Sequence, residues 1–325
     1  MKRDILERLG IKIGHYTDKK HLTGTSVFIA EKGAIVGIDI RGSNTGTFNT
    51  PAFSPKAISQ WIHAVVLTGG STYGLESAIG VMEALEEKKI GNKTRAAIIP
   101  ATTGAVIYDI AVGNSTVRPG KKEGRLAAEN ASYKNLKQGN IGVGTGATVG
   151  KWLKGKKMKG GFGMDFTELP GGIIVAAFVV TNSVGDMVNP QTGEFYFDSG
   201  GFDLKDKKID KMPSGLWGLM DTTPSNTTLA VIATNVALGK NQLSKVAELA
   251  HDGMARAVFP VHTMMDGDVI FALSSLSGEK KKLKDTMPFT AIDIIGLAAA
   301  DALGKAIKNS ILHAKGISSF PSFKD

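Results

Sequence analysis

The segment 224–238 constrains this chain most, because it joins a turn directly to a strand that must be buried. Its first residues, Pro-Ser-Asn at 224–226, favour a turn through a fixed φ and local side-chain hydrogen bonds. Residues 229–233 read Leu-Ala-Val-Ile-Ala, a short apolar run with β-branched members that predicts a buried strand. Thr227 and Thr228 lie between turn and strand. A hydroxyl there is held by the core and can face a cleft, so it is a candidate nucleophile; the alternative is an ordinary strand start.

Further apolar runs predict the rest of a layered α/β domain with packed sheets. The segment 24–40 resembles a hairpin, since two β-rich runs are joined by Glu-Lys-Gly at 31–33. Helical spacing of apolar residues is typical of 75–85, 243–254 and 290–313. Further strands are predicted at 63–68, 105–110, 173–180 and 269–273, and a further helix at 122–136.

The 325 residues fit one large domain or two small ones, and they include no cysteine. Disulfides, thiolate zinc sites, iron–sulfur ligation and cysteine nucleophiles are therefore excluded. The first ten residues carry charge without a following apolar core, so they do not form a secretory signal. The apolar segment 289–303 is too short and too charged to span a bilayer. We expect a soluble cytoplasmic protein.

The formal net charge of +9 raises the question of a nucleic-acid or membrane partner. Lysines cluster at 151–159, 205–211 and 280–284, but only Trp152 is interleaved with them, and no nucleic-acid-binding module is present. Charge runs of this kind usually mark solvated loops. We therefore expect neither nucleic acid nor membrane as a partner.

Several polar groups stand at predicted strand ends, each with an ordinary explanation beside a functional one. Lys151 follows a glycine-rich run; it is a surface lysine by default, and if buried near a hydroxyl its pKa would fall and it could accept a proton. Asn182 is a turn former whose amide could instead donate to an anion. Tyr108 is either a core aromatic or an oxyanion donor.

Two other patterns could hold a metal or a cofactor. The glycine-rich turn 69–74 follows a strand and precedes a helix, but it is neither GxGxxG nor a P-loop. The sequence Asp266-Gly267-Asp268 with nearby His262 lacks the further oxygens of a calcium loop, and Asp-Gly-Asp is most often a turn. We expect no cofactor and no metal.

Four motifs together resemble one family, the self-processing peptidases typified by L-aminopeptidase/D-Ala-esterase/amidase. The sequence is most similar to their branch of nylon-oligomer (6-aminohexanoate-oligomer) endo-hydrolases, and the likeness extends from about residue 11 to residue 313. The motifs are His63–Ser71 with Tyr73-Gly74-Leu75, Ala105–Asp109, Asn226-Thr227-Thr228 with Thr234-Asn235-Val236, and Pro260–Thr263 with Asp266-Gly267-Asp268.

The resemblance implies an N-terminal-nucleophile hydrolase with a four-layer α-β-β-α sandwich. One hydrolase domain, 1–325, would cut itself between Asn226 and Thr227 into a larger subunit, 1–226, and a smaller subunit, 227–325. Family members assemble as homo-oligomers, and we expect a tetramer of processed units.

The resemblance also assigns roles to matching positions. Thr227 is the nucleophile, and its own α-amine, once liberated, is a base with an ordinary pKa of about 7.7–8.0. Lys151 would hold the Thr227 hydroxyl. Asn182 and Tyr108 would donate to the oxyanion, and Asp266 and Asp268 would orient the amine and Lys151.

The leading hypothesis is an amidase that cleaves short linear amides, such as 6-aminohexanoate oligomers, through an acyl-Thr227 intermediate. An aminopeptidase or amidase on small peptides or on β- and D-amino-acid amides is the alternative. An acetyl transferase of the arginine-biosynthesis type and a basic binding module that stays uncut are the remaining hypotheses.

Overall fold

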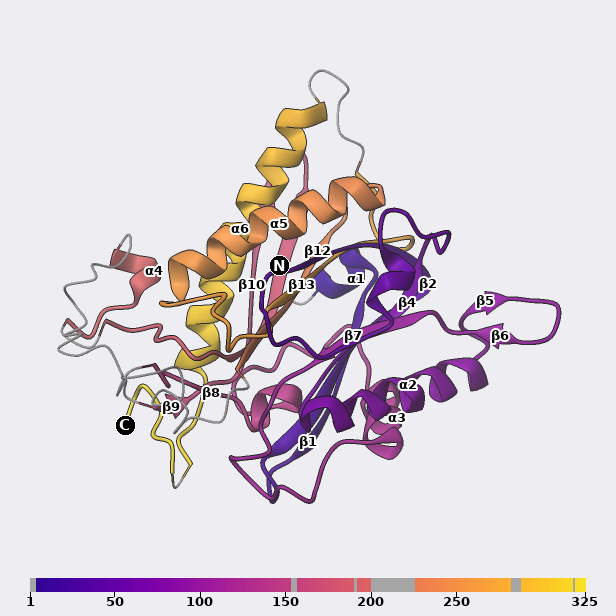
Figure 1. The fold of residues 1–325 in the computed structure, drawn as a ribbon. Helices are drawn as coiled ribbons and strands as arrows, with labels where there is room; N and C mark the ends of the chain where they lie inside the picture. Colours follow the sequence, from indigo (N-terminus) through magenta and orange to yellow (C-terminus); the bar gives the residue numbers. More distant parts are fainter. Residues whose placement is uncertain (1–3, 153–156, 190–191, 200–225, 282–287, 318) are drawn as a thin grey trace.

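The computed structural model describes residues 4–152, 157–189, 192–199, 226–281, 288–317 and 319–325 (Figure 1). The predicted turn at 224–226 therefore lies outside the described residues except for Asn226, as does most of the lysine cluster at 280–284 and all of that at 205–211.

Runs of strands are separated by helices along the chain. The helices are α1 (Ile5–Leu9), α2 (Glu76–Glu87), α3 (Lys121–Glu129), α4 (Tyr196–Ser199), α5 (Lys240–Ala257) and α6 (Pro288–Leu312). The longer strands are β1 (Lys12–Asp18), β2 (Thr23–Ile40), β4 (Ile62–Thr68), β7 (Thr102–Val106), β10 (Phe162–Leu169), β11 (Ile173–Asn182), β12 (Thr227–Thr234) and β13 (Val269–Ser275). The two-residue strands are β3 (Thr47–Phe48), β5 (Asn92–Lys93), β6 (Ile98–Ile99), β8 (Thr148–Val149) and β9 (Met158–Lys159).

The main sheet is mixed and has the strand order β10-β11-β12-β13-β2-β4-β7-β3, with β1 paired to β2. The strand that was predicted at 229–233 is its β12, which pairs antiparallel with β11 and parallel with β13. Strands β4 and β7 form the second parallel pair. Since β12 has a hydrogen-bonded neighbour on each side, it lies inside the sheet.

The sheet folds over so that its two halves face each other. Phe28 of β2 and Phe178 of β11 are not on neighbouring strands, yet their ring centroids are 5.3 Å apart. Alternate residues of β12 divide between two cores: Val231 packs into the core between the sheet halves, and Ile232 packs into a core shared with α5 and α6. A third core lies between β2, β4 and the helix pair α2 and α3.

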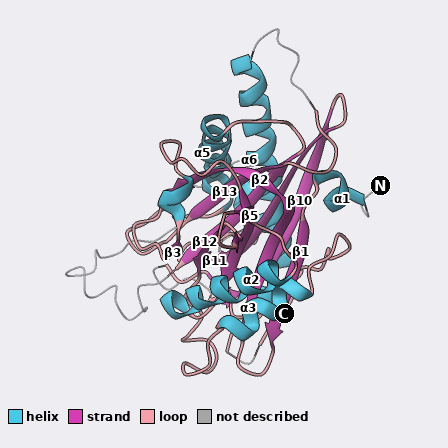
Figure 2. Ribbon diagram, turned by 90° about the vertical axis from the view of Figure 1, so that its right-hand side faces the viewer, coloured by secondary structure: helices cyan, strands magenta, loops and turns pink. Residues whose placement is uncertain are grey.

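These cores separate four layers, with α5 and α6 outside one half of the sheet and α2 and α3 outside the other (Figures 1 and 2). The predicted α-β-β-α sandwich is confirmed. No described helix is long and apolar enough to cross a membrane.

The hairpin predicted at 24–40 is wrong, because the segment is the single long strand β2. The exposed residues Glu31 and Lys32 form an irregularity in its pairing with β4, and Gly33 absorbs the bend with φ 90°. The two halves pair with different partners: 23–29 with β1, and 34–40 with β13. A local turn-like composition therefore marks a bend between two pairing regions.

Candidate active site

The predicted site residues come from strand ends and loops that meet at one end of β12. Thr227 is the first residue of β12, 5% exposed, and it lies opposite Asn182, the last residue of β11. On the other side of β12, Asn226 forms a parallel bridge with Asp266 just before β13. The sheet thus places Thr227 between Asn182 of β11 and the Asp266–Asp268 segment that precedes β13.

The bond between Asn226 and Thr227 is fixed by backbone contacts to the segment before β13. Asn226 N–H donates to the Met265 carbonyl at 3.1 Å, and Gly267 N–H donates to the Asn226 carbonyl oxygen at 2.7 Å. Asn226 itself is buried. Both backbone polar groups of Asn226 are therefore held, and its carbonyl belongs to the predicted cut bond.

Asp268 supports the residue that follows the candidate nucleophile. Its Oδ1 accepts Thr228 N–H at 2.6 Å, and its Oδ2 lies 2.7 Å from His262 Nδ1. The carboxylate is 1% exposed, so these donors take the place of water.

Asp266 is the second buried carboxylate of the pair. Its Oδ2 accepts the Thr263 hydroxyl at 2.6 Å and the Thr263 N–H at 3.1 Å, and its Oδ1 accepts Val184 N–H at 3.2 Å. Burial raises the pKa of Asp266, and the neighbouring charge of Asp268 raises it further.

Lys151 approaches Asn182 from the glycine-rich loop. Its Nζ lies 3.3 Å from both the carbonyl and the side-chain oxygen of Asn182. Burial lowers the pKa of Lys151 to about 7, against the opposing effect of the Asp266 charge. At neutral pH a large fraction of this amine is therefore unprotonated and able to accept a proton.

Tyr108 reaches the site through its backbone. Asn182 Nδ2 donates to the Tyr108 carbonyl at 3.2 Å, while Asn182 Oδ1 accepts Thr148 N–H at 3.0 Å. Asn182 is thereby oriented with its amide nitrogen toward the segment after β7. The contact to Tyr108 uses the carbonyl and not the hydroxyl.

The structure adds three groups that the sequence did not single out. They are the Gly267 N–H, the Thr263 hydroxyl, and His262 as a partner of Asp268. The sequence alone suggests His262 only as a metal ligand. These contacts depend on how the loop 262–268 turns back on itself, which the sequence does not predict. The only sequence signal for them is the Asp-Gly-Asp motif.

No group of three or more metal-ligating side chains that could hold an ion is found among the described residues. The pair Asp266 and Asp268 is instead surrounded by hydrogen-bond donors. The pair His262 and Asp268 is a direct contact between side chains.

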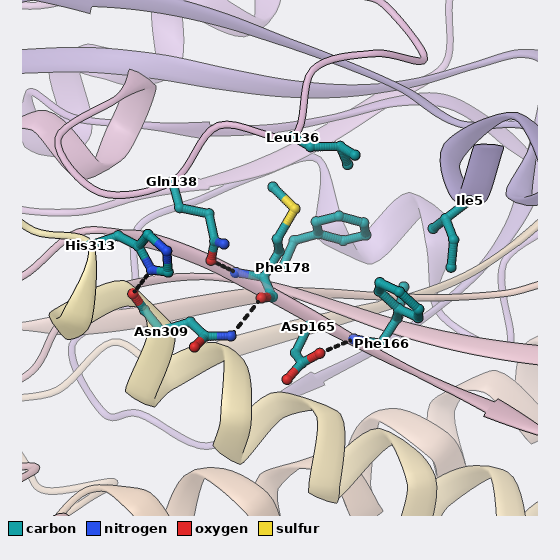
Figure 3. Close-up of a pocket in the computed structure, with 10 residues that line it drawn as sticks. Ile5, Leu136, Gln138, Asp165, Phe166, Phe178, Asn309 and His313 are labelled. Atoms are coloured by element: carbon teal, nitrogen blue, oxygen red, sulfur yellow. Dashed lines mark hydrogen bonds between the residues drawn. The ribbon is translucent and has the colours of Figure 1, made fainter. Parts of the chain in front are cut away.

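A separate cavity of about 410 Å³ lies at the outer edge of β10 (Figure 3). Its polar side chains cover the edge of the sheet: Gln138 Oε1 accepts Met164 N–H at 2.8 Å, and Asn309 Nδ2 donates to the Met164 carbonyl at 3.0 Å. Covering an edge in this way blocks pairing with another chain. None of the predicted site residues lines this cavity.

Comparison with known proteins places this arrangement in a family. The family described as "Peptidase family S58" matches residues 4–322. An uncharacterized aminopeptidase of Mycobacterium leprae is 34% identical over 341 residues, covering 97% of this chain and 91% of the relative. A 6-aminohexanoate-oligomer endohydrolase of Paenarthrobacter ureafaciens is 32% identical over 275 residues, covering 82% and 73%.

The fold has a solved counterpart in L-aminopeptidase D-Ala-esterase/amidase from Ochrobactrum anthropi, described as a variant of the Ntn hydrolase fold. The two chains align with a TM-score of 0.70 and 19% identity, over 94% of this chain and 84% of the other. The predicted family and fold are confirmed. The named relatives include both aminopeptidases and nylon-oligomer hydrolases, and the aminopeptidases match more of this chain.

Proposed function

Because the chain belongs to peptidase family S58 and is an amide hydrolase, we propose that it processes itself and that Thr227 is its nucleophile. Self-cleavage between Asn226 and Thr227 gives the pieces 1–226 and 227–325. The new α-amine of Thr227, with an ordinary pKa of about 7.7–8.0, then serves as the base for the adjacent hydroxyl.

One observation carries this proposal: Thr227 begins a central strand with Asn182 on one side and the Asp266–Asp268 segment on the other. A hydroxyl is a weak nucleophile until a nearby base accepts its proton. Thr227 starts its strand next to the segment that carries two buried carboxylates, which supports a catalytic role over a simple strand start.

The first cut needs a different base, since the intact chain has no α-amine at Thr227. Lys151 is suited to this step because its pKa is lowered to about 7 and its Nζ contacts Asn182, the register partner of Thr227. We assign it the proton of the Thr227 hydroxyl. In substrate hydrolysis, the second Asn182 amide N–H, which is not bonded to the Tyr108 carbonyl, and the Tyr108 hydroxyl are assigned to the oxyanion. Asp266 and Asp268 orient Lys151 and the amine.

The substrates we propose are short linear amides, with 6-aminohexanoate oligomers first. The endohydrolase of Paenarthrobacter ureafaciens supports this class by its name and its 32% identity. Aminopeptidase activity on small peptides is the second candidate, and the mycobacterial relatives support it because they match 97% of the chain. Initial rates on a 6-aminohexanoate trimer and on peptide amides separate the two.

We also propose that the processed unit forms a homo-oligomer, with a tetramer expected. On α6 the apolar side chains Ile294 and Leu297 are 49% and 66% exposed, and contact between copies would cover such residues. Light scattering after gel filtration measures the assembly.

The test compares two neighbouring hydroxyls by intact mass. Thr227→Val removes the proposed nucleophile, and we expect one uncut chain without amidase activity. Thr228→Val is the matched control, because the Thr228 hydroxyl is buried with no hydrogen-bond partner among the described residues. It should be cut and active like the wild type. A Thr227→Val protein that still yields two pieces would refute the proposal.

A further inference from the structure

The carbonyl of Asn226 is the group that a self-cleavage reaction attacks, and its oxygen already has a donor. Gly267 N–H donates to it at 2.7 Å. When a hydroxyl adds to a carbonyl, negative charge develops on that oxygen, and a fixed N–H aimed at it stabilises the transition state. The donor is a backbone group, so it is positioned by the fold rather than by a side-chain rotamer.

Gly267 also adjoins the attacking hydroxyl. A Cβ placed on this residue would lie 2.9 Å from Thr227 Oγ1 and 2.5 Å from the Asn44 carbonyl oxygen. There is no room for a side chain at this position. The residue therefore brings its N–H to the carbonyl while leaving space for the hydroxyl beside it.

The sheet order separates this donor from Asn182. Strand β12 lies between β11 and β13, with Asn182 on the β11 side and Gly267 immediately before β13. The Asn226 carbonyl points to the β13 side, because its oxygen bonds Gly267 N–H. The Asn182 amide lies on the opposite side of the strand and is engaged with the Tyr108 carbonyl.

We propose that the Gly267 N–H is the oxyanion donor for self-cleavage, and that this step uses a different oxyanion site from the one that Asn182 and Tyr108 provide for substrates. The inference rests on the proposed function, since it requires the cut before Thr227.

The chemical step balances within the chain. Thr227 Oγ forms a bond to the carbonyl carbon of Asn226, and the charge that develops on the carbonyl oxygen faces Gly267 N–H. The carbon–nitrogen bond then breaks, and the hydroxyl proton ends on the departing nitrogen as part of the new amine. Water hydrolyses the resulting ester, which restores the Thr227 hydroxyl and leaves a carboxyl group on Asn226.

The test removes the N–H without adding atoms. The full chain is made by cell-free translation with glycolate in place of Gly267, so that an ester oxygen replaces the amide N–H. We expect the rate of self-cleavage, followed by intact mass, to fall about 100- to 1000-fold, the usual loss for one oxyanion donor. Glycolate in place of Gly139 is the matched control, because Gly139 N–H makes an equally short 2.7 Å bond to the Phe162 carbonyl.

The outcomes are distinct. Normal self-cleavage of the Gly267 ester, or equal slowing of both esters, would overturn the inference while leaving the proposed function intact. A wild-type chain that never cuts under the same conditions would refute the proposed function itself.

A second measurement does not depend on folding of the ester. In the uncut Thr227→Val chain with ¹⁵N-labelled glycine, the Gly267 amide should be strongly protected from hydrogen exchange. An amide that exchanges as fast as an exposed loop would contradict the assigned hydrogen bond.

Discussion

Lys151 and Lys159 lie close together in the sequence, and burial lowers the pKa of each to about 7. The charge of a buried aspartate opposes this decrease in each case, Asp266 for Lys151 and Asp109 for Lys159. Burial raises the pKa of both carboxyls. Judged by the directions of their pKa shifts alone, the Lys151–Asp266 pair and the Lys159–Asp109 pair are the same kind of site. Their hydrogen bonds show that they are not.

Lys159 is fully satisfied where it lies. Its Nζ donates to the carbonyls of Gly144, Ala147 and Gly160 at 2.9, 2.7 and 2.7 Å, and its side chain is 0% exposed. Three acceptors use all three ammonium protons, so this lysine holds the glycine-rich loop in place.

Among the described residues, Lys151 has fewer and longer hydrogen bonds than Lys159. It is partly exposed, and within the described part of the chain its Nζ has two hydrogen bonds, both of 3.3 Å and both to Asn182. A perturbed pKa therefore locates a buried charge, whereas the long hydrogen bonds of Lys151 to Asn182, the register partner of Thr227, distinguish it as the candidate for proton transfer.

The largest effect should come from replacing each lysine by methionine. Lys151→Met should slow self-cleavage and amide hydrolysis by about 100- to 10,000-fold, the range for loss of a general acid–base group. Lys159→Met removes a donor from three buried carbonyls, of which that of Ala147 keeps the Gly160 N–H. The free energy of unfolding should fall by about 1–3 kcal/mol for each carbonyl left unpaired. Self-cleavage rates per folded molecule and urea unfolding measure the two effects.

This distinction between the two lysines would be wrong if folded Lys159→Met cleaved itself as slowly as Lys151→Met. Retention of full activity by Lys151→Met would remove Lys151 from the mechanism altogether.

The next effect separates the two lysines by pH. Because self-cleavage needs the unprotonated amine of Lys151, its rate should rise as pH increases through about 7 and level off above it. Lys151→Met should flatten this profile, and Lys159→Met should leave it unchanged. A profile that keeps its shape in Lys151→Met would assign the titration to another group.

Stability should follow pH through both lysines. Their pKa values fall from 10.5 in the unfolded chain to about 7 in the folded one, so the unfolded state binds more protons between these limits. The free energy of unfolding should therefore rise with pH across this window, by at most about 1.4 kcal/mol per pH unit for each lysine. Either methionine variant should reduce the slope, although only one changes the rate profile.

The smallest effect should come from removing the threonine hydroxyl that donates a hydrogen bond to each aspartate. Thr263→Val removes the 2.6 Å donor to Asp266, and Thr23→Val removes the 2.7 Å donor to Asp109. Each change raises the pKa of its carboxyl further. Thr23→Val should cost about 1–3 kcal/mol of stability without altering the rate profile.

Thr263→Val should instead move the Lys151 limb of the rate profile to lower pH. A more protonated Asp266 favours the Lys151 ammonium less, so the lysine pKa falls. A shift in the opposite direction, or the same shift in Thr23→Val, would show that the two carboxyls do not differ in this way.

Sequence patterns predicted the interior of the fold better than its edges. Uniformly apolar runs such as 173–180 and 229–233 became β11 and β12, because a strand covered on both faces needs apolar residues throughout. Strands β1 and β10 were not predicted, since much of each is only partly buried and its composition is mixed. The sequence predicts a hairpin in place of the single strand β2, because a glycine at a bend and a glycine in a turn have the same local sequence pattern.

For the site, the sequence supplied the side chains but not the backbone groups between them. The resemblance named Thr227, Lys151, Asn182, Asp266 and Asp268, and the structure brings these residues together. The Gly267 N–H was not foreseen because every residue except proline carries one. Only the parallel pairing of β12 with β13 aims this particular N–H at Asn226.

The interior position of β12 also determines what a cut at its first residue can release. The fragment that begins there supplies β12 and β13, which stay flanked by β11 and β2 of the other fragment. Separating the fragments would mean pulling two middle strands out of an intact sheet. The severed protein should therefore co-purify as one particle until denaturant melts it, and each fragment should remain insoluble without its counterpart.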